Sequence, residues 1–80
     1  KKTMSDWAEE FAAATATAER IQAAEAEAEG LLDRAHAQAY ALGDKSQALT
    51  TAEFHNWMAA RHATDAAWGV WSTVMDAKPI

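Results

Sequence analysis

Apolar residues recur at helical spacing along two long stretches of the chain. In the first stretch, alternating steps of four and three residues meet eleven positions, ten of which are apolar. They are Trp7, Phe11, Ala14, Ala18, Ile21, Glu25, Ala28, Leu32, Ala35, Ala39 and Leu42. This spacing predicts a helix with a coiled-coil-like seam, whose many alanines let a neighbouring helix approach closely. For the polar exception, Glu25, the favoured explanation is that the register shifts or the helix bends away there; the alternative is that the residue fixes the register of a self-association.

The first helix is expected to begin at an acidic cap and to meet a glycine before it ends. Asp6 is a suitable N-cap residue, and Glu9 three residues later completes a capping box. Gly30 interrupts the pattern at a cost of about 1 kcal/mol relative to alanine, which long flanking helices tolerate. The chain therefore has either one continuous helix, slightly favoured, or two helices that meet at Gly30. The corresponding ranges are 6–42, or 6–29 and 31–42.

A glycine ends the first helical stretch, and two capping signals begin the next one. Gly43 is a natural residue for the position after a helix, and 43–46 reads as a turn.

The start of the last helix, expected over 51–76, is marked twice. Thr50 and Glu53 form a capping box, and Leu49 and Phe54 supply the hydrophobic staple around it. The helix should end before the chain's single proline, because the residue that precedes a proline is biased away from helical geometry.

The last helix divides into an apolar and a polar face at 100° per residue. The apolar face collects Trp57, Ala60, Ala63, Ala67, Trp68, Val70, Trp71, Val74 and Met75. The polar face collects His55, Arg61, His62, Asp65, Gly69, Ser72, Thr73 and Asp76. The three tryptophans are therefore expected in the core. Phe54 and Met58 lie among the polar residues, which makes them candidates for an exposed contact.

These elements predict an all-α fold with one domain over residues 1–80. The expected architecture is either a long antiparallel helical hairpin or, if the chain bends at Gly30, a compact three-helix bundle. In both, the large rings of the last helix pack on the alanines of the first. An unbent hairpin would leave apolar surface uncovered, and dimerisation or partner binding would follow.

Composition and charge exclude several classes of function. Alanine supplies 22 of the 40 apolar residues, and the absence of cysteine excludes disulfides and thiolate metal sites. No apolar run approaches the ~20 residues of a membrane span, so the expected location is the cytoplasm. The net charge is −5, and residues 3–33 hold eight acids and one base. This charge disfavours nucleic acids and membranes as direct partners and favours a protein with a basic surface.

Metal binding and catalysis are both disfavoured by the spacing of the chemically active residues. His55 and His62 are two helical turns, about 10 Å, apart, too far for one ion to bridge. His62 and Asp65 are suitably spaced, but two ligands do not make a closed site, and Arg61 competes for Asp65 as an ion pair. No nucleophile with an oriented base and no glycine-rich phosphate loop is evident. We expect no cofactor, no metal and no enzymatic activity.

The leading hypothesis is an acidic helical module for protein–protein interaction. By analogy of class alone, its size, charge and lack of motifs fit inhibitors from phages or mobile elements, anti-CRISPR proteins among them, which block basic nucleic-acid-handling proteins by steric cover or charge mimicry. The expected partner-binding residues are Trp7, Glu9, Glu10, Glu19, Glu25, Glu27, Glu29, Asp33, Phe54 and Met58. The alternatives are a homodimeric helical bundle with a structural role, or a ligand carrier that uses His55, His62 and Asp65.

Overall fold

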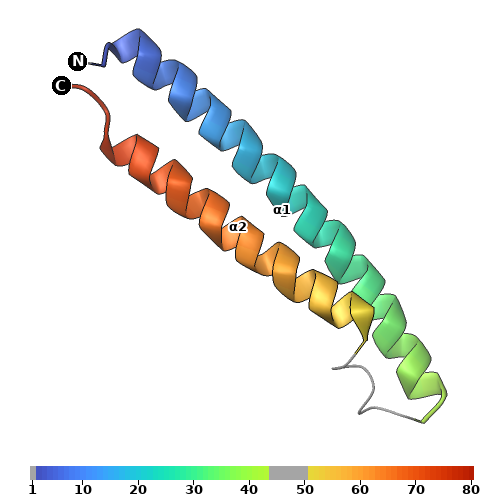
Figure 1. The fold of residues 1–80 in the computed structure, drawn as a ribbon. Coiled ribbons are helices and arrows are strands. Elements are labelled where there is room, and N and C mark those ends of the chain that lie inside the picture. Colours follow the sequence, from blue (N-terminus) through green and yellow to red (C-terminus); the bar gives the residue numbers. More distant parts are fainter. Residues whose placement is uncertain (1, 44–50) are drawn as a thin grey trace.

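The chain folds into two long antiparallel helices. The structure is a computed structural model, which describes residues 2–43 and 51–80. Helix α1 is Met4–Ala41 and helix α2 is Ala52–Asp76; they lie side by side along a rod of 60 × 15 × 14 Å, with both termini at one end (Figure 1). The described residues contain no strand, so the all-α prediction is confirmed.

The first helix runs through Gly30 without a break. The predicted hairpin is therefore correct, and the three-helix bundle with separate helices over 6–29 and 31–42 is wrong. The physical reason is that the seam continues on both sides of the glycine: Ala28 is half-buried and Leu32 is buried against α2. Packing on both sides offsets the cost of about 1 kcal/mol that a helical glycine imposes.

The N-cap residue of α1 lies three residues further upstream than predicted. Thr3, not Asp6, is the N-cap residue: its hydroxyl accepts a hydrogen bond from the Asp6 amide at 3.0 Å. The Asp6 carboxylate in turn accepts one from the Thr3 amide at 3.4 Å, which completes the capping box. The predicted motif is thus present with its first member moved from Asp6 to Thr3, so Glu9 has no capping role.

The C-terminus of α1 agrees with the prediction. Gly43 has φ +76°, the left-handed conformation that glycine adopts without steric cost. Its amide donates a hydrogen bond to the Tyr40 carbonyl at 3.0 Å, which satisfies one of the free carbonyls at the helix end.

Helix α2 begins one residue later than predicted. Thr51 is the N-cap residue in place of Thr50, because its hydroxyl accepts from the Phe54 amide at 3.1 Å, three residues on. Leu49, Thr50 and the rest of the predicted turn lie outside the described residues. The helix ends at Asp76, before the proline, as predicted.

The seam of α1 is confirmed over nearly its whole length. Ten of its eleven predicted positions are buried or half-buried, and only Leu42, 78% exposed beyond the end of the helix, lies outside the interface. Glu25 is in the seam as well, so the favoured explanation, a shift of register or a bend of the helix there, is wrong.

The face of α2 that meets α1 is rotated from the predicted one. Thr64, absent from the predicted apolar face, is buried, whereas Val70 is 59% exposed and Ala63 is exposed. A threonine is tolerated in the interface because its hydroxyl donates to the Ala60 carbonyl at 3.1 Å. The contact stripe of α2 therefore passes through Thr64 and Ala67, with Val70 at its edge.

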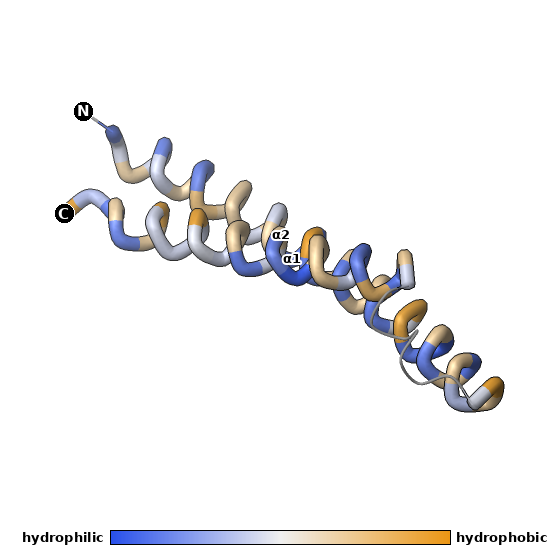
Figure 2. Tube along the Cα trace, turned by 60° about the horizontal axis from the view of Figure 1, so that its bottom comes forward, coloured by the Kyte–Doolittle hydropathy of each residue, from blue (hydrophilic) through white to orange (hydrophobic). Residues whose placement is uncertain are grey.

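The hairpin buries little of itself. In the described residues only Ala18, Leu32, Thr64 and Ala67 are buried, and no large side chain is fully enclosed. Strongly hydrophobic positions are few and separated along both helices (Figure 2). The radius of gyration is 17.9 Å, against about 11.6 Å for a compact domain of this length. Half-buried rings between the helices therefore carry most of the packing.

Candidate functional site

The two helices meet along a seam with two unlike sides, and large rings fill one of them. We call this side the aromatic flank; it consists of Trp7, Phe11, Trp68 and Trp71. Trp7 stacks on Phe11 at 5.0 Å between ring centroids, Phe11 lies 5.4 Å from Trp71, and Trp71 meets Trp68 edge to face at 5.4 Å. Aromatic pairs at such distances are favourable beyond the area they bury. This cluster closes the flank towards the termini.

Hydrogen bonds from the indole N–H groups hold the aromatic flank across the seam. Trp71 donates to the Thr15 hydroxyl at 2.9 Å, and Trp68 to the Gln22 side chain at 3.2 Å.

Trp7, predicted as an anchor for a partner, has a similar role inside the hairpin. It is half-buried, its indole donates to the Val74 carbonyl at 2.6 Å, and the Lys78 amine lies 5.5 Å from its ring centroid. The ring of Trp7 therefore contacts residues of its own chain rather than standing free as an anchor for a partner.

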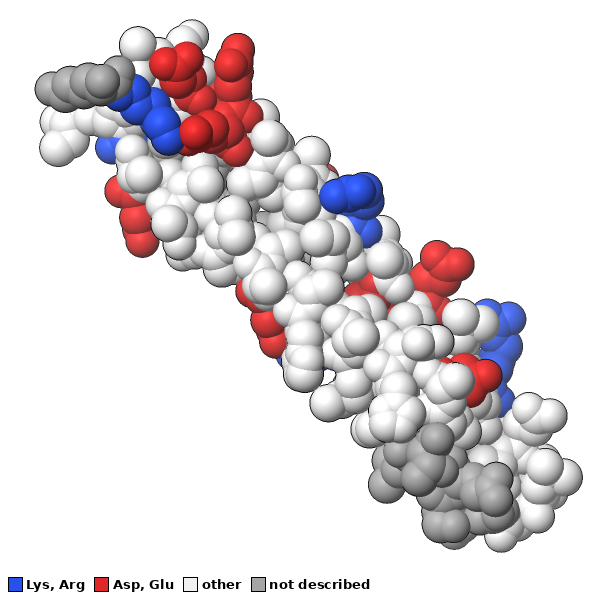
Figure 3. All heavy atoms as spheres, in the orientation of Figure 1, with Lys and Arg blue, Asp and Glu red and all other residues white. Residues whose placement is uncertain are grey.

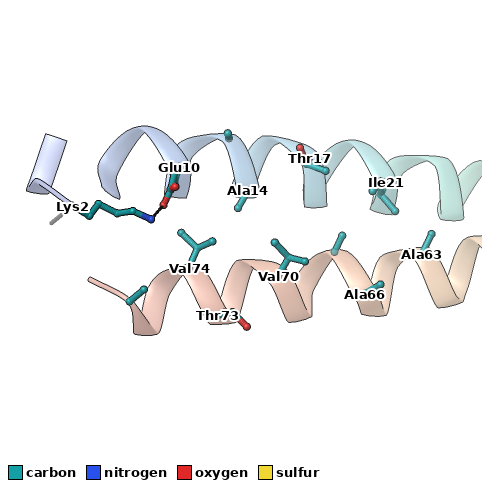
Figure 4. A pocket seen from close by; sticks show the side chains of 13 residues that line it. Lys2, Glu10, Ala14, Thr17, Ile21, Ala63, Ala66, Val70, Thr73 and Val74 are labelled. Carbon is teal, nitrogen blue, oxygen red and sulfur yellow. Dashed lines mark hydrogen bonds and ion pairs between the residues drawn. The ribbon is translucent and has the colours of Figure 1, made fainter. Parts of the chain in front are cut away.

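The opposite side of the seam is an open groove with a volume of about 810 Å³. We call it the alanine groove. In Figure 4, Ala14 and Ile21 point from α1 towards α2, and Ala63, Val70 and Val74 point back. Its full lining is Lys2, Glu10, Ala13, Ala14, Thr17, Ile21, Ala63, Ala66, Ala67, Val70, Thr73, Val74 and Ala77. No aromatic residue lines the groove. Its side chains are too short to fill the space between the helices, which the rings fill on the aromatic flank.

The alanine groove is almost free of charge. Among the described residues, its only charged side chains are Lys2 and Glu10, which form an ion pair with each other at one end. On the face shown in Figure 3, a broad uncharged band runs along both helices, and charged side chains gather at its edges and towards the end that holds the termini. The groove is thus an apolar surface with one neutralised charge pair.

The carboxylates predicted to face a partner fall into two groups. Glu9, Glu19, Glu27, Glu29 and Asp33 are all exposed, and none forms an ion pair within the described residues.

Two other predicted carboxylates have internal partners. Glu10 pairs with Lys2, and Glu25 lies 3.5 Å from the Arg61 guanidinium across the seam, with its side chain 13% exposed. The structure therefore does not bring all seven acids onto one surface.

The two apolar residues predicted as exposed contacts lie at the edge of the seam. Phe54 and Met58 are half-buried, and the Phe54 ring packs 6.2 Å from Trp57. Nearby in the two helices, three enclosed polar atoms lack a hydrogen-bond partner among the described residues: Glu25 Oε1, His36 Nε2 and Trp57 Nε1. This half of the seam is less completely satisfied than the aromatic flank.

The structure gathers no metal site in the part of the chain it describes. No group of three potential ligands lies close together there. His55 and His62 are exposed, and Asp65 lies 4.0 Å from Arg61, the ion pair expected from the spacing. Neither described helix combines the length and the apolar character needed to cross a bilayer.

Sequence reasoning missed the alanine groove as a site. Ala63 and Val70 were expected in the core, but they line the open groove, and Ala13 and Thr17 of α1 drew no attention. The available signal was the row of small residues beside the seam on each helix, spaced by three and four. No protein-family model, curated protein or solved structure matches the chain.

Proposed function

We propose that this protein is a protein–protein interaction module that acts by covering a basic surface of another protein. The observation that carries the proposal is the set of exposed, unpaired carboxylates on α1: Glu9, Glu19, Glu27, Glu29 and Asp33. Carboxylates without a partner cation among the described residues remain available for lysine and arginine of another chain. A protein with net charge −5 is also steered towards a basic surface over long range.

The chemistry of the chain supports steric cover rather than a reaction. A rigid rod with an acidic exterior suits a partner that handles nucleic acid, because such a partner presents rows of basic residues for phosphates. The proposed activity is inhibition of that partner by charge mimicry, as in inhibitors of the phage or anti-CRISPR class. Direct binding of nucleic acid is opposed by the same charges.

Affinity capture from the native host with three baits tests this function. The baits are the wild-type chain, Glu19→Lys/Glu27→Lys on α1, and the matched control Asp65→Lys/Asp76→Lys on α2, which changes net charge equally. We expect the wild type and the control to retain a protein with a basic surface, and the α1 variant to lose it. The wild-type chain should also displace nucleic acid from that protein.

Equal capture by all three baits would reject the acidic surface of α1 as the contact. A captured protein that still binds its nucleic acid in the presence of excess wild-type chain would reject inhibition by mimicry. Circular dichroism of each bait confirms that the helices are intact before either comparison is made.

A further inference from the structure

We propose that a second copy of this chain docks on the alanine groove, so that two hairpins form a four-helix bundle. The inference is separate from the proposed function, since it uses the uncharged flank of the hairpin and leaves the exposed carboxylates of α1 on the outside. Two helical hairpins that face each other across a shared apolar core are a common way to complete such a bundle.

The single chain exposes more surface than a compact monomer of its mass, and the excess is similar to the area that one partner buries in a stable dimer. A folded monomer of this mass, 8.7 kDa, exposes about 4,700 Å² according to the usual scaling of area with mass. The chain exposes 5756 Å², roughly 1,000 Å² more than this expectation. A stable interface covers about 800 Å² on each partner. Over its whole surface, the elongated chain therefore exposes an excess of the size that one docking face requires.

Charge selects the second copy as the occupant of the groove. A basic partner is attracted to the outer carboxylates rather than to a surface whose only charges, Lys2 and Glu10, already neutralise each other. Two copies with net charge −5 repel each other on most approaches. Among the described residues, none of the exposed carboxylates without an ion pair lines the alanine groove, so the repulsion between two copies is smallest when they meet there.

The shape of the groove is complementary to itself. Alanines from both helices make a shallow hollow, which Val70, 59% exposed, also lines. In a two-fold arrangement each residue of the face meets the same face of the other copy. Val70 of one copy can then enter the hollow between alanines of the other, as a knob enters a hole, while the small residues let the backbones approach.

Leu31 extends the same face towards the far end of α1. It is 46% exposed and lies two heptads after Thr17, which places it on the flank of the groove. A docked second copy would cover this side chain as well. The apolar face is thus longer than the groove itself.

Sedimentation velocity over micromolar to millimolar concentration tests the proposal. The wild-type chain should sediment as a dimer, and Val70→Lys should weaken association by more than about a hundredfold, because an unpaired charge in the dimer interface is strongly unfavourable. The matched control, Ser72→Lys, places the same charge two residues away, at an exposed position outside the groove, and should remain dimeric.

Cross-linking of single-cysteine variants provides a second measurement of association, which remains informative if Val70→Lys does not fold. The chain has no cysteine, so Ala66→Cys and Ser72→Cys each provide one thiol for a flexible bismaleimide. The Ala66→Cys chain, labelled in the groove, should form covalent dimers, and the Ser72→Cys chain should not.

The proposal is overturned if the wild-type chain stays monomeric over the whole concentration range, whatever else fills the groove. It is also overturned if Val70→Lys associates as strongly as the wild type. Equal cross-linking of the two cysteine variants overturns it as well. The α1 variant Glu19→Lys/Glu27→Lys should still dimerise, which separates this outcome from loss of the proposed partner.

Discussion

The two flanks of the seam use the same pair of helices for different purposes. On the aromatic flank, Trp71 and its neighbours fill the space between the helices and donate hydrogen bonds across it. On the alanine groove, side chains such as Ala66 and Thr17 are too short to reach across, and the space stays open. The difference shows that ring placement, rather than helix pairing, decides which side of a hairpin is closed.

Because of this asymmetry, the side of the seam that stabilises the fold is not the side that stays open. A two-helix hairpin with four buried residues in its described part depends on its rings for stability, because alanine buries little apolar area. The alanine groove contributes less to the fold and is correspondingly free to accept another surface. Substitutions on the two flanks should therefore have unlike effects.

The largest expected effect is the loss of a ring from the aromatic flank. Trp71→Ala removes the contacts with Phe11 and Trp68 and the hydrogen bond to Thr15. It should lower the free energy of unfolding by about 3 kcal/mol, enough to unfold a hairpin of this size. Urea denaturation followed by circular dichroism measures the loss. Trp71→Phe, which keeps a ring but not the N–H group, should cost clearly less; equal losses would mean that the ring packing is unimportant.

Two adjacent alanines compare the closed seam with the open groove. Ala67 is buried in the seam at the bottom of the groove that it also lines, whereas Ala66 is an exposed residue of the same groove. Ala67→Leu should therefore overpack the seam and cost about 1–3 kcal/mol. Ala66→Leu should change the stability of the isolated hairpin by less than about 0.5 kcal/mol. Thermal unfolding at low protein concentration checks the pair, and similar losses would contradict the open groove.

The ion pair in the seam predicts two changes of opposite sign. Arg61→Ala leaves the enclosed Glu25 carboxylate without its cation and should cost about 1 kcal/mol, less than for a fully buried pair because Arg61 is 56% exposed. Glu25→Leu replaces the carboxylate with an apolar group and should stabilise the hairpin by about 1 kcal/mol. Urea denaturation measures the sign of the change in the free energy of unfolding for each variant. If Glu25→Leu destabilises the hairpin, the ion pair is a net source of stability and this prediction is wrong.

Glycines outside both flanks should give effects of about 1 kcal/mol or less. A methyl group at Gly30 meets no atom within 4 Å, so Gly30→Ala should stabilise α1 by about 0.5–1 kcal/mol. Gly43→Ala should have the opposite sign, since φ +76° costs an alanine about 1 kcal/mol. Melting temperatures of the two variants provide the comparison. A stabilising Gly43→Ala would contradict the left-handed C-terminus of α1.

Spacing predicted α1 better than α2 for a physical reason. The seam of α1 follows steps of three and four through residues as different as Phe11 and Ala35, although its many alanines let other registers fit fairly well. The apolar arc of α2 is broad, and only contact with α1 decides that Thr64 is buried while Val70 stays 59% exposed in the open groove. Residue type alone misleads here, since the hydroxyl of Thr64 is satisfied by its own helix.

The candidate site was less predictable than the fold. The exposure of carboxylates such as Glu19 and Glu27 could be predicted, because charged residues off the seam of an amphipathic helix normally face solvent. The alanine groove depends on which side of the seam the rings take, and neither helix encodes that by itself. The cap at Thr3 was missed because Thr3, Ser5 and Asp6 are all suitable cap residues, and the true one is selected by where the first turn can still form.

Nuclear Overhauser contacts from the tryptophan rings test most directly the claim that rings close one flank and leave the other open. The account predicts contacts from the Trp71 ring to Phe11 and Thr15, and none from any indole to the methyl groups of Ala13 or Ala66. Contacts between an indole ring and those two groove alanines, with none from Trp71 to Thr15, would contradict it.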